Sequence, residues 1–151
     1  MPSSYTFLDV RVDNITIDQT IDKVARAIKA EKALNIVTVN PELVMTATKH
    51  DEFKEVITNS DIVTPDGVGL VIMGSLTGRR LKQRVTGVDL CDRLAQEAAK
   101  HSWSIYLLGA KPGVAEQAGK NLVAKYPELT IAGTNSGDPD DASAQDILMD
   151  I

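Results

Sequence analysis

The sequence predicts an α/β fold, in which a mainly parallel sheet is flanked by helices and a small β element lies at the N-terminus. Short apolar stretches rich in β-branched residues alternate with stretches whose apolar residues follow helical spacing. Turn-forming residues separate the two kinds of stretch, as expected for repeated βαβ units. The 151 residues, 43% of them hydrophobic and 25% charged, fit one compact domain, 1–151.

The N-terminal element is predicted as two short strands, 8–12 and 15–17, around a turn at Asp13 and Asn14. Apolar and polar residues alternate through the first of these strands, which is typical of a sheet with one buried face. Asp18 is then expected to cap a helix, because apolar residues recur at helical spacing after it. We therefore expect a small β element followed by a covering helix.

The next stretch, 34–39, is nearly continuous in apolar and β-branched residues, which favours a parallel strand buried on both faces. It ends at Asn40, a good N-cap, and the following Pro41 and Glu42 suit the first turn of a helix. A second helical piece is expected to open at Asp51. This stretch is the first β-loop-α unit of the fold.

The β-loop-α pattern then repeats along the chain. Strands are predicted at 61–64, 104–108 and 129–132, and helices at 68–73, 88–100 and 114–125. In this Rossmann-like arrangement ligands collect at the carboxyl ends of the strands, which nominates the loops that begin at Thr38, Thr64, Gly109 and Gly133. A last helical stretch, 146–151, shows no C-cap and no strand after it, so we expect a C-terminally truncated piece of a longer protein.

Composition excludes several classes of function. The 21 acidic and 16 basic residues give a net charge of −5, which disfavours a broad basic surface for nucleic acid. The single cysteine, Cys91, cannot form an internal disulfide and is expected to be a small buried residue, and no Cys/His spacing suits zinc. No apolar stretch reaches the roughly 18 residues of a membrane span. We therefore expect a cytoplasmic protein without a metal site.

Thr38 and Asn40 stand where the 34–39 strand passes into its helix, so both side chains can face a ligand that lies over the strand ends. Plain N-capping explains Asn40 equally well. The two interpretations predict the same local structure, and the sequence leaves both open.

Asp66 comes directly after a predicted buried strand, in the turn that Pro65 and Gly67 form with it. Burial at such a place raises the pKa of a carboxyl group toward that of a useful general base. An ordinary turn uses the same residue types. Asp66 is therefore the catalytic candidate of the chain, with a structural turn as the alternative.

A basic segment, 78–87, interrupts an otherwise acidic protein. Its four cations are Arg79, Arg80, Lys82 and Arg84. A guanidinium group can bind two oxygens of a phosphate at once, and the flanking glycines suggest a segment that closes over an anion. A solvated basic loop is the alternative.

Residues 109–113 form a glycine turn between a predicted strand and a predicted helix. Gly109 and Gly113, with Ala110 and Lys111 between them, let backbone N–H groups approach a diphosphate at a helix N-terminus. The segment matches neither the Walker A loop nor the G-x-G-x-x-G dinucleotide fingerprint. Phosphate binding at this turn therefore does not point to ATP or nicotinamide chemistry.

Four motifs, taken in this order, resemble the WecG/TagA/CpsF family of bacterial glycosyltransferases, most closely its TagA branch. The motifs are NIVTVNPE at 35–42, DIVTPDGVG at 61–69, RVTGVDL at 84–90 and YLLGAKPG at 106–113. The resemblance also covers the N-terminal β element and its helix, and so runs through nearly the whole chain.

The resemblance implies transfer of N-acetylmannosamine from UDP-N-acetylmannosamine to the 4-hydroxyl of N-acetylglucosamine on undecaprenyl diphosphate, in the linkage unit of wall teichoic acid. Transfer would proceed with inversion and with neither metal nor cofactor. Asp66 would match the general base, and Arg84 would offset charge on the UDP leaving group. The positions expected to bind substrate are Thr38, Asn40, Gly67, Gly109, Ala110, Lys111 and Gly113.

Family members continue past residue 151 with a strand, a glutamine-containing motif and a C-terminal membrane-association segment. Family members also self-associate, so the resemblance implies a homo-oligomer, and their membrane-association segment implies that the full-length form lies peripherally at the inner face of the cell membrane. Its partners would be a UDP-sugar donor and a polyprenyl-diphosphate-linked sugar acceptor. Three alternatives stay open: a related transferase with a mannosaminuronic acid or glucose-type donor, an oxidoreductase of Rossmann type, and a non-catalytic UDP-binding core.

Overall fold

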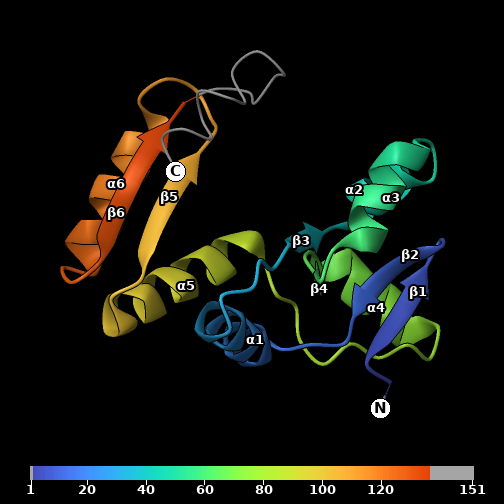
Figure 1. Cartoon of the computed structure of the whole chain (residues 1–151). Helices are drawn as coiled ribbons and strands as arrows, with labels where there is room; N and C mark the ends of the chain where they lie inside the picture. Colours follow the sequence, from blue (N-terminus) through green and yellow to red (C-terminus); the bar gives the residue numbers. More distant parts are fainter. Residues whose placement is uncertain (1, 137–151) are drawn as a thin grey trace. The chain divides into compact units, whose positions relative to one another are not determined.

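The computed structural model describes residues 2–136 of the chain (Figure 1). Its strands are β1 (Ser4–Phe7), β2 (Val10–Asp13), β3 (Ile36–Val39), β4 (Ile62–Pro65), β5 (Ser104–Leu108) and β6 (Thr130–Asn135). Its helices are α1 (Ile17–Lys29), α2 (Pro41–Ala47), α3 (Asp51–Asn59), α4 (Val68–Leu76), α5 (Gly87–His101) and α6 (Val114–Lys125). The chain divides into two compact units, Met1–Leu90 and Cys91–Ile151, and each is described by itself.

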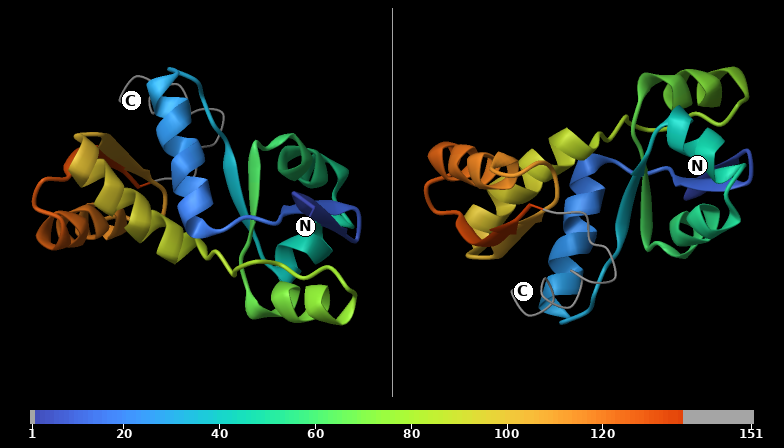
Figure 2. Two further views of the ribbon diagram at one scale, coloured as in Figure 1. Left: turned by 90° about the horizontal axis from the view of Figure 1, so that it is seen from below. Right: turned by 90° about the horizontal axis from the view of Figure 1, so that it is seen from above.

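Strand pairing confirms the predicted α/β class. β3 pairs with β4 in parallel and β5 pairs with β6 in parallel, while β1 and β2 form the antiparallel element expected at the N-terminus. In the first unit, the β3–β4 pair lies between α1 on one side and α2, α3 and α4 on the other (Figure 2). The assignment of 1–151 to one catalytic domain stays a prediction.

The core of the first unit surrounds β4, whose four residues are all buried. Buried apolar side chains of this core come from β1, β2, β3, β4 and the helices α2, α3 and α4. They are Phe7, Val10, Val12, Val39, Val44, Ala47, Ile57, Val63 and Leu70, with Leu81 from the basic segment. Because apolar contacts surround β4, the residues at its carboxyl end have a fixed support.

The core of the second unit lies where α5 and α6 pack with the β5–β6 pair. Ala95 and Ala98 of α5 are buried there with Leu129. The partly buried side chains around them are Ala99, Trp103, Ile105, Leu122, Tyr126 and Ile131. Small residues on α5 let the neighbouring elements approach closely, so this unit has a core of its own.

The predicted turn at Asp13 and Asn14 is wrong. The hairpin turns instead at Leu8 and Asp9, whose φ angles are 48° and 63°. Asp13 ends β2, and its carboxylate accepts a backbone N–H of β4 at 2.8 Å. The buried Asn14 side chain accepts the Lys82 N–H at 2.8 Å. Long-range hydrogen bonds, which local turn propensity does not contain, therefore set the position of this hairpin.

Thr16, and not Asp18, caps α1. The Thr16 hydroxyl accepts the Gln19 N–H at 3.2 Å, and the Gln19 side chain accepts the Thr16 N–H at 3.1 Å, which completes a capping box. Asp18 lies in the first turn of α1, where its negative charge interacts favourably with the positive end of the helix dipole. Residues 15–17, predicted as a strand, are instead the approach to α1 and its first residue.

β3 is shorter and less buried than predicted. It covers Ile36–Val39 instead of 34–39, and of its four residues Val39 is the buried one. Asn35 lies just before the strand, where its N–H donates to the Asp61 carboxylate at 2.8 Å. The strand buried along its whole length is β4.

The later elements agree more closely with the sequence. β5 and α6 have their predicted bounds, and α4 extends three residues past the predicted end, to Leu76. The prediction of a loop that begins at Gly133 is wrong, because β6 continues to Asn135. Gly133 suits this strand since a Cβ there would lie 2.6 Å from the Tyr106 ring. Cys91, expected to be buried, is exposed.

Two further sequence expectations concern the chain as a whole. Over the described residues, the structure contains no helix with both the length and the apolar character that a membrane span requires. The predicted helix at 146–151 lies outside the described residues.

Candidate active site

The parallel register of β3 and β4 brings Thr38 and Asp66 to the same end of the strand pair. Thr38 is the register partner of Thr64, and Val39 is the partner of Pro65. The Asp66 N–H then donates to the Val39 carbonyl at 2.7 Å, which extends the pairing by one residue. The end of each strand is therefore fixed by its neighbour, as the carboxyl-end rule predicts.

The Asp66 carboxylate is half-buried and bonded to the backbone. Its Oδ2 atom accepts the Gly87 N–H at 3.0 Å. Within the described residues its Oδ1 atom accepts no hydrogen bond from the protein, so that oxygen can accept a proton from a ligand. One oxygen thus orients the group while the other remains available for chemistry.

The chain segment before α5 is held against the end of β4. The Val85 N–H donates to the Pro65 carbonyl at 2.8 Å, and the buried Thr64 hydroxyl donates to the Val85 carbonyl at 3.4 Å. These contacts place Gly87, the first residue of α5, beside the Asp66 carboxylate. A carboxylate at a helix N-terminus is stabilised by the helix dipole and by free N–H groups.

Gly87 also brings Thr38 next to Asp66. A Cβ added to Gly87 would lie 3.3 Å from Thr38 Oγ1 and 3.8 Å from Asp66 Oδ2. The Thr38 hydroxyl and the Asp66 carboxylate therefore face the same glycine. The structure brings these two predicted site residues together.

Asn40 performs the capping role that one interpretation gave it. Its side-chain oxygen accepts the Leu43 N–H at 2.8 Å at the start of α2, with Pro41 in the first turn. Gly67 lies against these residues, since a Cβ there would be 3.2 Å from Pro41 Cδ and 3.5 Å from Asn40 Cβ. Gly67 also has a φ angle of +110°, which strongly favours glycine. Capping is confirmed, and ligand binding by Asn40 and Gly67 stays a prediction.

Arg84 is exposed and immediately precedes Val85, whose N–H bonds to the end of β4. Within residues 2–136, its side chain makes no hydrogen bond or ion pair. The guanidinium is therefore free to bind an anion near the carboxyl end of β4. The other cations of the basic segment, Arg79, Arg80 and Lys82, are exposed as well.

The interaction of Gly87 with Asp66 was not predicted from the sequence. Thr86 caps α5, because its hydroxyl accepts the Asp89 N–H at 3.0 Å and donates to the Asp89 carboxylate at 2.6 Å. The spacing Thr-x-x-Asp is the local signal that a helix starts at Gly87. The capping pattern shows where the helix begins, while only the fold shows which carboxylate it meets.

The 109–113 loop lies in the second unit and, unlike the turn at Asp66, has open space around its glycines. Gly109, Ala110 and Gly113 have φ angles of 109°, 66° and 84°. The Gly109 N–H is already used by the Asn135 carbonyl at 2.9 Å, while a Cβ on Gly109 or Gly113 would meet no atom within 4 Å. Lys111 is exposed. The loop therefore offers open backbone and one cation.

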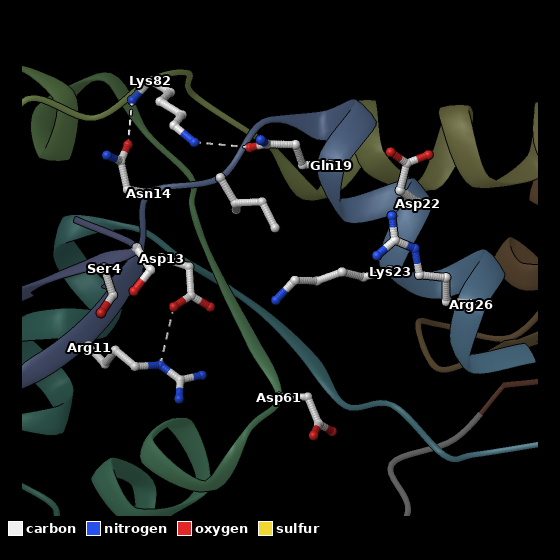
Figure 3. Close-up of a pocket in the computed structure, with 12 residues that line it drawn as sticks. Ser4, Arg11, Asp13, Asn14, Gln19, Asp22, Lys23, Arg26, Asp61 and Lys82 are labelled. Atoms are coloured by element: carbon white, nitrogen blue, oxygen red, sulfur yellow. Dashed lines mark hydrogen bonds and ion pairs between the residues drawn. The ribbon is translucent and has the colours of Figure 1, made fainter. Parts of the chain in front are cut away.

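A polar pocket of about 560 Å³ lies beside β4, between Asp61 at one side of the view and Asn14 and Lys82 at the other (Figure 3). Asp61, which precedes β4, lines it, whereas Asp66 follows the strand. Its charged lining residues are Arg11, Asp13, Asp22, Lys23, Arg26, Asp61 and Lys82. Arg11 and Asp13 pair at 3.4 Å, and Lys82 donates to Gln19 at 3.3 Å. Because the predicted site residues do not line this pocket, it is separate from the Asp66 site.

The described residues contain no cluster of three or more His, Cys, Asp or Glu side chains that could hold a metal ion. Asp66 and Asp89 both lie near the start of α5, but Asp89 is bonded to the Thr86 cap and Asp66 to Gly87. The side chains gathered at the carboxyl end of β4 are the Asp66 carboxylate, the Thr38 hydroxyl and the exposed Arg84 guanidinium.

The WecG/TagA/CpsF glycosyl transferase family model matches residues 5–151. A Bacillus subtilis protein named N-acetylglucosaminyldiphosphoundecaprenol N-acetyl-beta-D-mannosaminyltransferase is 37% identical over 102 residues, which cover 68% of this chain and 40% of that protein. A Staphylococcus aureus protein of the same name is 32% identical over 127 residues, 83% of this chain and 50% of that protein. The chain spans half or less of the length of these relatives. The chain belongs to the WecG/TagA/CpsF family of glycosyl transferases.

Proposed function

We propose that the chain is the core of an inverting glycosyltransferase that moves N-acetylmannosamine from UDP-N-acetylmannosamine to N-acetylglucosamine on undecaprenyl diphosphate. The observation that carries this proposal is the Asp66 carboxylate, held by the Gly87 N–H at 3.0 Å beside Thr38. The names of the Bacillus and Staphylococcus relatives support the choice of transferred sugar and acceptor.

Asp66 acts as the general base in this proposal. Its Oδ1 atom accepts the proton of the 4-hydroxyl of N-acetylglucosamine while the hydroxyl oxygen attacks the anomeric carbon of the donor sugar. The bond from that carbon to the diphosphate oxygen breaks, and UDP leaves with the electron pair. A positioned base of this kind contributes a factor of about 10²–10⁴ to the rate. The hydrogen bond from Gly87 fixes the orientation of the carboxylate, so little reorganisation is needed during the reaction.

Arg84 offsets the charge that develops on the UDP leaving group. Its exposed guanidinium, free of partners within the described residues, suits a diphosphate, and it would replace a divalent cation in this role. Thr38 and Asn40 orient the sugar, and Gly67 leaves room beside them. Ala110, Lys111 and Gly113 supply backbone N–H groups and the Lys111 cation for phosphate oxygens, while Gly109, whose N–H bonds to the Asn135 carbonyl, contributes open space beside them.

The proposal extends to the setting of the reaction. The acceptor carries a polyprenyl chain, so in this proposal the whole protein works peripherally at the inner face of the cell membrane. A homo-oligomer is proposed on the family resemblance alone. Neither a metal nor another cofactor takes part. A mannosaminuronic acid or glucose-type donor is the alternative substrate class within the same chemistry.

Titration calorimetry of this chain with UDP tests the donor site. We expect UDP to bind with equal affinity in the presence of magnesium or of a chelator, and NAD not to bind. Arg84→Gln should weaken UDP binding by about tenfold, because a charge-assisted contact is lost. Equal affinity for NAD and UDP would contradict the proposal and favour a Rossmann-type oxidoreductase.

A transfer assay tests the reaction itself. The chain is incubated with UDP-N-acetylmannosamine, UDP-N-acetylglucosamine or UDP-glucose and with an N-acetylglucosamine diphosphate acceptor on a short prenyl chain. We expect a disaccharide from the first donor. Product from another donor alone would replace the proposed substrate, and UDP binding without any product would favour a non-catalytic UDP-binding core.

A further inference from the structure

The basic segment, 78–87, is attached to the first unit although residues 79–86 belong to no helix or strand. Leu81 is buried in the core of that unit, and the Arg79 N–H donates to the Gly74 carbonyl at 2.7 Å. The flanking glycines suggested a segment that closes over an anion. Buried and hydrogen-bonded residues instead hold its backbone in one place, because opening it would break these contacts.

Asn14 follows β2 and reaches the basic segment across 68 positions of the chain. The residue is 3% exposed, and both polar atoms of its side chain are bonded. Oδ1 accepts the Lys82 N–H at 2.8 Å, and Nδ2 donates to the Pro2 carbonyl at 3.2 Å (Figure 3). Buried amide groups are normally hydrogen-bonded, and a lost partner is costly there. Asn14 therefore ties the N-terminal element to the basic segment.

Hydrogen bonds lie on both sides of Arg84. The Gln83 side chain accepts the Ile17 N–H at 2.9 Å, and the Val85 N–H donates to the Pro65 carbonyl at 2.8 Å. Arg84 itself is exposed, and within residues 2–136 its side chain makes no hydrogen bond or ion pair. The structure thus fixes the point from which the Arg84 side chain extends and leaves its guanidinium free.

The N-terminal hairpin is anchored without the Asn14 side chain. The Asp13 carboxylate accepts the Val63 N–H at 2.8 Å, which holds β2 against β4. Buried valines of β2 also lie in the core of the first unit. The bond from Lys82 to Asn14 is therefore distinctive for what it holds, which is the segment that carries Arg84.

We propose that Asn14 is a positioning residue for Arg84. By accepting the Lys82 N–H, it holds the basic segment so that the guanidinium meets the donor diphosphate near the carboxyl end of β4. This inference rests on the proposed function, in which Arg84 offsets charge on UDP. Binding is tighter when the binding group is ordered beforehand, because less conformational entropy is lost on binding. Asn14 itself touches no substrate.

Titration calorimetry of the 151-residue chain with UDP tests whether Asn14 acts through Arg84. Asn14→Ala should weaken UDP binding by about three- to tenfold, the loss expected when one long side chain must be ordered on binding. Asn14→Ala with Arg84→Gln should bind UDP no more weakly than Arg84→Gln alone, because the contact that Asn14 supports is already lost. Losses that add would show that Asn14 affects UDP binding by another route, which would overturn the proposal.

Hydrogen exchange at Val85 tests the same role without nucleotide. The Val85 N–H bonds to Pro65 and not to Asn14, so its exchange reports on the segment beyond Arg84. It should be at least about fivefold faster in Asn14→Ala than in the matched control, Ser60→Ala. Ser60 is also buried, at 2% exposure, but its hydroxyl donates to the Val56 carbonyl at 2.8 Å, outside the segment. Equal exchange in the two variants would reflect overall stability alone and contradict the proposal.

Asn14→Asp is the conservative variant, and it can be measured even if Asn14→Ala folds too poorly for titration. It keeps an oxygen that can accept the Lys82 N–H and loses the donor to Pro2. UDP affinity and Val85 exchange should both lie within about threefold of the values for the unchanged chain. A variant as impaired as Asn14→Ala would show that the bond to Lys82 is not what matters.

The remaining outcomes separate the role of Asn14 from the proposed function. If the unchanged chain does not bind UDP, the proposed donor site is wrong, and exchange at Val85 still decides whether Asn14 holds the segment. If Arg84→Gln weakens UDP binding and Asn14→Ala does not, the role of Asn14 alone is contradicted. If Arg84→Gln leaves UDP binding unchanged, both proposals for this segment are contradicted.

Discussion

The ends of the two parallel strand pairs differ in what holds them. At the end of β3 and β4, hydrogen bonds connect Asp66 to Val39 and to Gly87 at 2.7 and 3.0 Å, and side chains pack around the turn. At the end of β5, a Cβ on Gly109 or Gly113 would meet no atom within 4 Å. A backbone hydrogen bond ties each strand end to the neighbouring strand, from Gly109 to Asn135 at 2.9 Å in the second unit, but only the β5 end has open space around its glycines.

The difference indicates two kinds of binding. A carboxylate that must remove a proton needs a fixed position, and the β3–β4 end supplies it through backbone donors. A diphosphate needs N–H groups and space for its oxygens, and the residues of positive φ at Gly109, Ala110 and Gly113 provide an open backbone. The first end therefore suits side-chain chemistry and the second suits phosphate contact.

The largest effect is expected from removing the charge of Asp66. Asp66→Asn keeps an oxygen that can accept the Gly87 N–H but cannot take up a proton at neutral pH. The rate of sugar transfer should fall by about 10²–10⁴, while UDP affinity changes by less than about threefold. Single-turnover kinetics and UDP titration measure the two quantities on the same preparation.

Asp51→Asn is the matched control for this change. Asp51 is an exposed aspartate in the first turn of α3. Within the described residues, no site residue forms a hydrogen bond or an ion pair with it. Its loss should leave the transfer rate unchanged. Equal rates in the Asp66 and Asp51 variants would show that Asp66 is a turn residue and not the base.

The two strand ends should also differ in their tolerance of a methyl group. Gly67→Ala meets Pro41 Cδ at 3.2 Å and has φ and ψ of 110° and 135°, so it should lower the free energy of unfolding by about 1–3 kcal/mol. Gly113→Ala has open space and φ and ψ of 84° and −13°, so about 1–2 kcal/mol is expected.

Urea unfolding, with hydrogen exchange to locate the change, measures both variants. The exchange of β3 and β4 amides should increase in the Gly67 variant, and that of β5 and β6 amides in the Gly113 variant. A larger loss at Gly113 than at Gly67 would contradict the view that the β3–β4 end is the more closely packed one.

Local sequence signals predicted many of the helix starts and turns of the fold, and long-range contacts account for those that were missed. Asn40 and Pro41 start α2 as expected, because capping depends on residues that are close in sequence. The hairpin turn at Leu8 and Asp9 was missed, since the side chains that favour a turn at 13 and 14 bond to β4 and to Lys82 instead. The sequence therefore predicts element order better than it predicts which polar side chains the fold uses.

The candidate site shows the same division. The carboxyl-end rule places Thr38 and Asp66 together correctly, since both follow from strand assignment. Contact with Gly87 needs the path of the basic segment back to Pro65, and nothing local to residues 78–87 specifies that path. Residue roles at such a site therefore require the fold.

A moderate effect is expected at the open end. Lys111→Gln removes an exposed cation from the 109–113 loop and should weaken UDP binding by up to about fivefold, as for a solvent-screened charge pair. Calorimetry at two salt concentrations should show a smaller salt dependence for the variant. Lys120→Gln, which changes an exposed cation on α6, should have no such effect, and an equal effect of both would remove the loop from the phosphate site.

The smallest effect concerns an ion pair that connects α5 and α6 in the second unit. Lys125 Nζ lies 2.6 Å from Asp92 Oδ1, and the Tyr126 hydroxyl donates to Asp92 Oδ2 at 3.1 Å. The hydrogen bond from Lys125 lowers the pKa of Asp92, and the same bond raises the pKa of Lys125. Both side chains are about half exposed, so solvent screens the pair and its contribution to stability is small.

The pH dependence of that contribution follows from the lowered pKa of Asp92 and the raised pKa of Lys125. Because the folded pKa of Asp92 is lowered, its stabilisation is present above the ordinary carboxyl pKa of about 4 and is lost as pH falls through the lower folded value. Because the folded pKa of Lys125 is raised, its stabilisation is present below about 10.4 and is lost as pH rises through the higher folded value. Asp92→Asn should lower the melting temperature by about 2 °C or less at pH 7, and the difference should shrink as the pH falls below about 4. Asp22→Asn on α1 serves as the control in circular dichroism melts, and a difference that does not shrink as the pH falls below about 4 would show that Asp92 stabilises the unit by packing and not by charge.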